Sequence, residues 1–182
     1  MATPTTLPAT FVAGNVLTAA QMNGLRGAFR ILQTVSTLKT DTFTSTTAGA
    51  FTDITGYSVS ITPSSTSSKI LLIATMNCTV FRPAVVARGF RFVRDSTAIA
   101  VGDAAGSRIQ ASFGATSASD EISTQISGMV LDSPNTTSAT TYKVQFRQGN
   151  STAFYLNRST NDSDSTDGYR MASSITAFEV SA

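Results

Sequence analysis

Apolar side chains recur at every second position from about residue 33 to the C-terminus, and clusters of turn-forming residues interrupt them about every ten residues. The clearest case is the segment 141–147, in which Tyr142, Val144 and Phe146 alternate with polar side chains. A repeat of two residues places all the apolar side chains on one face of an extended strand. The pattern therefore predicts a succession of half-buried β-strands.

The predicted strands are short, and no helical pattern lies between them. Residues 69–81 begin with apolar side chains on both faces, which predicts a central strand covered on both sides. The other segments predicted to be strands are 57–61, 90–94, 99–101, 109–113, 122–131, 153–157 and 175–180. Because a parallel sheet needs long crossover connections, residues 33–182 are predicted to form an all-β, antiparallel sandwich of the jelly-roll type.

Residues 1–32 follow a different pattern, which predicts an extended arm and one short attachment helix. Residues 1–16 are rich in Thr and Pro, whereas Thr18 and Gln21 form a capping box ahead of an apolar stripe with helical spacing. Two glycines in the stripe weaken an isolated helix by about 1 kcal/mol each, so the helix packs on its own domain or on a partner. The residues of this attachment or oligomer seam are Phe11, Leu17, Met22, Leu25, Phe29 and Leu32.

The composition excludes several kinds of chemistry. The chain has no His and one Cys, so it lacks a Ser-His-Asp triad, a Cys-His pair and a His-ligated zinc site. Cys78 is predicted to be a small core residue. No nucleophile elbow or glycine-rich phosphate loop occurs. We therefore predict a protein that is not an enzyme and that uses no cofactor.

Charge and hydropathy bear on the partners. The net charge of +2 is too small to indicate a nucleic-acid partner. The longest apolar run, residues 70–74, is far shorter than the roughly 20 residues that span a bilayer, so membrane insertion is not expected. Residues 1–10 have no signal-peptide pattern, which indicates synthesis in the cytoplasm.

A loop of residues 161–168 carries three carboxylates before a glycine, as calcium loops do. Its spacing does not fit an EF-hand, so a solvated loop is expected and no metal site is assigned. Tyr169, beside this loop, is the best candidate for an exposed aromatic contact with sugar.

Arg88, Arg91 and Arg94 cluster around two phenylalanines. Guanidinium groups bind carboxylates at desolvated interfaces, so these residues are a possible interface. The alternative is that their charged heads point into water from an edge strand.

Residues 11–23 resemble the leader of many tailed-phage virion proteins, in which an aromatic-x-x-Gly-x-x-Leu-Thr-Ala-x-x-x-Asn pattern precedes a helix and an exposed β domain. Residues 51–63, 68–71 and 131–144 are similar to stretches of β-rich phage structural proteins. The resemblance implies a virion component, commonly a trimeric jelly roll similar to the tumour-necrosis-factor and C1q folds, with residues 11–23 as its attachment segment.

The expected function is therefore a non-enzymatic structural component of a phage particle, assembled in the host cytoplasm. Its expected partners are itself, as a homotrimer, and other virion proteins. A tail fibre or related appendage is favoured, and a capsid decoration protein is the alternative. From another class, a carbohydrate-binding or glycan-degrading module acting on host surface glycan remains open, with its site near Tyr169 and residues 162–167.

Overall fold

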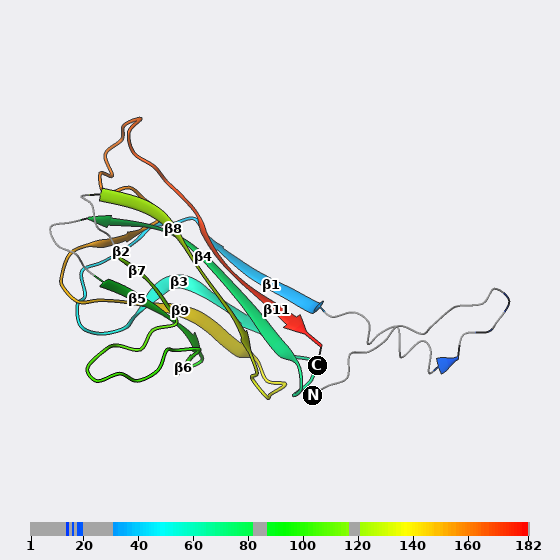
Figure 1. The fold of residues 1–182 in the computed structure, drawn as a ribbon. Coiled ribbons are helices and arrows are strands. Elements are labelled where there is room, and N and C mark those ends of the chain that lie inside the picture. The colour runs from blue at the N-terminus through cyan, green and yellow to red at the C-terminus, as the bar shows by residue number, and fades with distance from the viewer. Residues whose placement is uncertain are drawn as a thin grey trace.

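The computed structural model of the chain describes residues 31–81, 87–116 and 121–181, together with Gly14, Val16, Thr18 and Ala19. The elements in these ranges are strands that form two antiparallel sheets packed face to face (Figure 1). The strands are β1 (Ile31–Lys39), β2 (Phe43–Ser45), β3 (Thr52–Ile61), β4 (Lys69–Phe81), β5 (Ala87–Arg94), β6 (Thr97–Ile99), β7 (Phe113–Thr116), β8 (Glu121–Asp132), β9 (Thr140–Gln148), β10 (Phe154–Leu156) and β11 (Ser173–Val180). The prediction of an all-β sandwich is confirmed.

The strand pairs are nested along the chain. β5 pairs with β7, β4 with β8, β3 with β9, and β1 with β11, all antiparallel. Sheet A contains β1, β11, β4, β10, β2 and β8, and sheet B contains β3, β9, β5, β6 and β7. Folding a nested set of antiparallel pairs into two layers produces a jelly roll, as the alternating pattern predicts.

Aromatic side chains fill the space between the sheets. Phe146 from sheet B stacks on Phe154 from sheet A, with ring centroids 4.1 Å apart, and Phe90 lies 5.9 Å from both rings. Cys78 is also fully buried, as predicted. Each large apolar side chain removed from water stabilises the fold by about 1.5–3 kcal/mol. The aromatic residues that are at most 1% exposed are Tyr57, Phe90, Phe92, Tyr142, Phe146 and Phe154.

Three expectations from the sequence are corrected. β4 is central, but its outer face is not covered along its whole length, and Leu71 and Ile73 on that face are half-buried. The segment 109–113 is not a strand, because Gly102 N donates to Ala111 O and holds it in a loop. The strand instead begins at Phe113.

The third correction concerns the boundary at residue 32. β1 begins at Ile31, so Leu32 belongs to the sandwich and not to a helix. The segment 20–30, which contains most of the predicted helix, lies outside the described residues. So do the other predicted seam residues, Phe11, Leu17, Met22, Leu25 and Phe29.

Glu179 joins β1, β11 and the loop between β3 and β4. Its buried carboxylate accepts hydrogen bonds from Gln33 Nε2 (2.6 Å), the Ser64 backbone N–H (2.7 Å) and Ser64 Oγ (2.6 Å). Burial alone raises the pKa of this carboxyl, but the hydrogen bonds from Ser64, Ser68 and Gln33 outweigh it and lower the pKa from 4.5 to about 2. The ionised carboxylate is therefore a structural group in the folded protein.

Gly128 tests how tightly the two sheets are packed. A Cβ atom at this position would lie 2.5 Å from Phe113 Cε1 and 2.6 Å from Phe113 Cδ1. We expect Gly128→Ala to destabilise the protein by about 1–3 kcal/mol, because the ring has to move within a filled core. Chemical denaturation measures the loss. Gly149→Ala, where a Cβ meets nothing within 4 Å, is the control, and an equal loss in both variants would contradict this account.

Glu179 predicts how stability depends on pH. Since its folded pKa of about 2 lies below the unfolded value of 4.5, the carboxylate stabilises the fold fully above pH 4.5 and loses this effect as the pH falls toward 2. We expect Glu179→Gln to lower stability at neutral pH by about 2 kcal/mol and to flatten the dependence on pH in this interval. Thermal unfolding at several pH values between 2 and 4.5 measures this dependence of stability on pH. Asp103→Asn, on an exposed loop, should follow the unaltered protein, and an unchanged slope in Glu179→Gln would refute the assignment.

Candidate functional site

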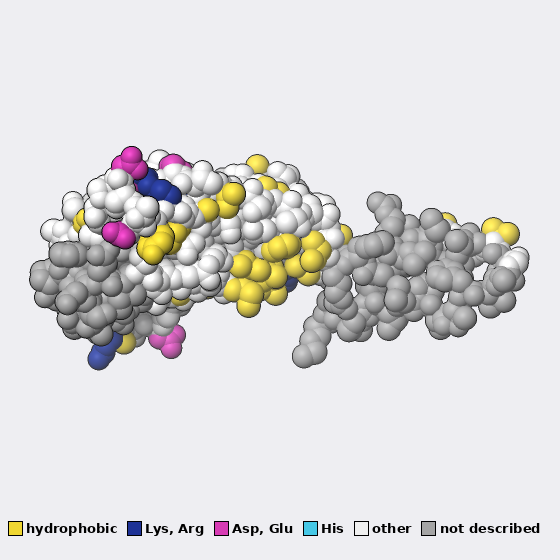
Figure 2. Space-filling view, turned by 90° about the horizontal axis from the view of Figure 1, so that it is seen from above, with side chains coloured by type: hydrophobic (Ala, Val, Ile, Leu, Met, Phe, Trp, Pro, Cys, Tyr) yellow, Lys and Arg dark blue, Asp and Glu magenta, His cyan; other side chains and the backbone are white. Residues whose placement is uncertain are grey.

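The outer side of sheet A carries a partly exposed apolar surface, which we call the apolar face. It consists of the exposed Met129 and Leu131 and the half-buried Leu71, Ile73 and Phe178. The register places these side chains in two adjacent rows. One row runs Thr34–Phe178–Leu71–Leu131, and the next runs Ser36–Thr176–Ile73–Met129. Met129 is 71% exposed and Leu131 is 58% exposed. Figure 2, which views the molecule from above, shows one large group of hydrophobic side chains beside several smaller ones.

The surroundings of the apolar face are polar but largely uncharged. One flanking residue, Lys69 on β4, is charged, and its Nζ donates to Ser133 Oγ at 2.7 Å. The other polar residues flanking the face along β1, β4, β8 and β11 bear hydroxyl or amide groups: Thr34, Ser36, Thr75, Asn77, Gln125, Ser127, Ser174 and Thr176. In the view of Figure 2 the surface next to the large group is mostly white, the colour of uncharged polar side chains and backbone. A contiguous apolar surface with a polar rim is typical of a protein–protein contact.

β1 extends this surface. Leu38 is 66% exposed and lies on the same side of β1 as Thr34 and Ser36. Leu32, the residue of the predicted seam that the structure describes, is 43% exposed and lies at an irregularity in the pairing of β1 with β11, between Ile31 and Gln33. Because the alternation of sides is interrupted there, only Leu38 is assigned to the side of the apolar face.

The alternating pattern revealed only part of the apolar face. The consecutive apolar residues 70–74 predicted that residues 69–81 form a strand covered on both sides, whereas the outward residues of the other strands were expected to be polar. A second signal was available in the run Met129, Val130 and Leu131. Each run exceeds what a strand with one buried face requires.

The structure does not bring the three predicted interface arginines together. Arg88 is buried, and no described residue accepts a hydrogen bond from its Nε or Nη2. Arg91 lies 4.0 Å from the centre of the Phe51 ring, and its Nε donates to Gln145 Oε1. Arg94 donates to both carboxylate oxygens of Asp132, at 3.1 and 2.9 Å.

These placements show that the three arginines do not form one cluster. Arg88 and Arg94 lie on one side of β5 and Arg91 on the other, because their spacings of six and three residues are even and odd. The three side chains therefore share no single surface, and β5, which pairs with β9 on one side and with β6 and β7 on the other, is not an edge strand. A contact of any of them with a partner stays a prediction.

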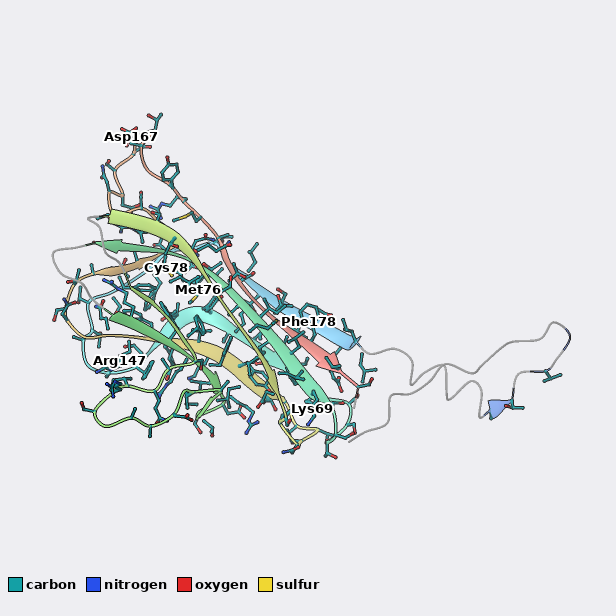
Figure 3. The ribbon with its side chains drawn as sticks, in the orientation of Figure 1. Lys69, Met76, Cys78, Arg147, Asp167 and Phe178 are labelled. Atoms are coloured by element: carbon teal, nitrogen blue, oxygen red, sulfur yellow. The ribbon has the colours of Figure 1, made fainter. Side chains whose placement is uncertain are left out.

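A long loop of residues 157–172, which we call the β10–β11 loop, projects from one end of the sandwich, with Asp167 at its tip (Figure 3). Its base is fixed by Asn157, which is buried, has a φ of 62° and donates from Nδ2 to Lys39 O at 2.8 Å. Ser159 and Tyr169 are joined across the loop by two hydrogen bonds, of 3.1 and 3.2 Å. The loop therefore has a defined shape and displays an aromatic ring.

Of the three carboxylates that the sequence places in this loop, Asp162 lies between two arginines. Asp162 forms ion pairs with Arg158 at 3.3 Å and with Arg170 at 2.7 Å. Within the described residues, no three His, Cys, Asp or Glu side chains come together as metal ligands would. Two guanidinium groups on Asp162 also disfavour a cation there.

The most reactive side-chain types are shielded. Burial raises the pKa of the Cys78 thiol to about 12, so the thiol is protonated at neutral pH. Burial, together with the hydrogen bond from its hydroxyl to Asp132, also raises the pKa of Tyr142. Both groups lie between the sheets as structural residues.

Among the described residues there is no helix long and apolar enough to cross a membrane.

Comparisons with known proteins identify no family. Neither a protein-family model nor a curated protein matches the chain. Among solved structures, the chain is similar to one in the structure of infectious bursal disease virus, Gx strain, with 12% sequence identity and a TM-score of 0.36. The similarity covers 81% of this chain and 37% of that viral chain.

Proposed function

We propose that the protein is a non-enzymatic structural component of a tailed-phage particle, that it forms a homotrimer, and that it docks to other virion proteins through its N-terminal segment. The observation that carries the proposal is the apolar face. The core between the sheets is complete without these side chains, so their exposure adds nothing to the stability of a single chain. An exposed apolar surface that contains Met129 and Leu131 is typical of a surface that becomes buried against a partner.

A second copy of the chain fits this face. The residues around it are uncharged except Lys69, which follows Leu71 on the outward side of β4, so little like charge opposes the approach of two copies. Three copies about one axis would direct the apolar faces toward one another and share a core that each lacks alone. The chain has a single Cys and therefore no internal disulfide, which makes association a main source of additional stability.

The predicted attachment segment supports the location in a particle. Residues 11–23 resemble the leader of phage virion proteins, and the chain enters the sandwich from this segment at Ile31. Ile31 is paired with Val180 at one end of the molecule, and the β10–β11 loop lies at the other end (Figure 1). A protein held through its N-terminal segment would thus expose that loop, as a tail appendage that contacts the host does.

The oligomeric state tests the role of the apolar face. We expect native mass spectrometry of the full chain to show three copies of the 19.0 kDa chain, and the double variant Met129→Glu, Leu131→Glu to be a folded monomer. Both residues are exposed in the single chain, so the charges disturb association and not the core. Ile109→Glu, at a position that is 50% exposed in another loop, should stay trimeric. A monomeric unaltered protein, or a trimeric double variant, would contradict the proposal.

Particle composition tests the location. We expect the protein in purified virions and, by cryo-EM, at the tail. A chain without residues 1–30 should keep the β-sheet signal in circular dichroism but fail to enter particles. Density on the head would replace the tail assignment with capsid decoration, whereas virions that contain no copy would remove both.

A further inference from the structure

We propose that the β10–β11 loop binds one sugar ring of an uncharged glycan, with Tyr169 as the surface on which the ring stacks. The inference concerns a binding site and does not depend on the oligomeric state. It depends on the proposed function only in the statement that the loop faces away from the particle.

Tyr169 differs from the other tyrosines in its surroundings. Tyr57 and Tyr142 are fully buried, and Tyr155 lies beneath the guanidinium of Arg158, 4.4 Å from its ring centre. Tyr169 is 64% exposed. Its ring offers an apolar face with negative π-density, which matches the slightly positive C–H groups on one face of a sugar, and its hydroxyl remains available to water or ligand.

Tyr169 borders a hollow of about 240 Å³ in the loop. The hollow is smaller than the roughly 300–1,000 Å³ of sites that enclose drug-sized ligands, so it suits a single ring and not an extended chain. Its polar wall contains hydroxyls, carboxylates and a guanidinium, which together can accept from and donate to the hydroxyls of a sugar. The side chains in this wall are those of Asp162, Ser163, Asp164, Ser165 and Arg170.

The charges in the loop select an uncharged ligand. Asp162 is already balanced by Arg158 and Arg170. Asp164 and Asp167 are exposed, and neither forms an ion pair within the described part of the chain. The loop thus has an excess of negative charge at its tip, which repels carboxylated or sulfated sugars and leaves carboxylate oxygens free to accept from neutral hydroxyls.

The loop is braced before any ligand binds. The Ser159–Tyr169 hydrogen bonds, the Asp162 ion pairs and the buried Asn157 hold its two arms together. A preformed site loses less conformational entropy on binding than a mobile loop does. Copies displayed side by side would add avidity to a weak single site.

The experiment is saturation-transfer NMR on the full-length protein with the methyl glycosides of glucose, galactose and mannose at millimolar concentration, and with methyl glucuronide as the charged counterpart. We expect transfer to the ring protons of at least one neutral glycoside and none to the glucuronide. Tyr169→Ala should weaken binding roughly tenfold, because the stacking surface is lost, and Asp164→Asn should weaken it less. Tyr169→Phe keeps the ring and should retain binding.

Asp103→Asn, which removes a carboxylate from a different exposed loop, is the matched control and should bind as the unaltered protein does. Melting temperatures verify that all variants are folded. No transfer to any neutral glycoside, equal binding by Tyr169→Ala, or a preference for the glucuronide would each overturn the proposal. Native mass spectrometry of the same samples keeps the two proposals separate. An unaltered protein that is trimeric but binds no neutral glycoside refutes this site alone, and an unaltered protein that binds sugar as a monomer refutes the trimer alone.

Discussion

Burial of one side of every principal strand between the two sheets is the constraint on which the rest of this structure depends. The layer formed by Phe90, Phe146 and Phe154 joins strands from both sheets and is closed to solvent. Because protein interiors are packed as densely as organic crystals, each inward side chain must fit the side chains around it. The contact between Gly128 and Phe113, for example, leaves no room for one methyl group. Side chains that could contact a partner or a ligand are therefore confined to the outward faces of the sheets and to the loops.

Buried polar groups hold the layers in register. The Tyr57 hydroxyl donates to Ser174 O at 2.7 Å and is also 3.1 Å from Thr75 O, so it joins sheet B to two strands of sheet A. Glu179 closes the end of the sandwich where β11 finishes. Polar groups that are fully hydrogen-bonded specify one arrangement of a core that apolar contacts alone would leave less defined.

The two proposed contacts use different parts of the fold for a physical reason. A sheet face is broad and rigid, so the apolar face of sheet A suits a large contact with another copy. A braced loop is small and polar, so the β10–β11 loop suits a ligand the size of one ring. Figure 3 shows Phe178 on sheet A and Asp167 at the loop tip well apart, which allows both contacts at once.

The sequence alone determined the fold class and most of the strands, because a two-residue repeat can bury its apolar side chains only in a sheet. It also indicated the exposed Tyr169. The tertiary structure decided what depends on distant partners: the nested pairing, the separation of Arg88 and Arg94 from Arg91, and the two arginines around Asp162. It also aligned Met129 and Leu131 with Leu71 and Ile73, residues far apart in the chain, because only strand register determines which outward side chains share a surface.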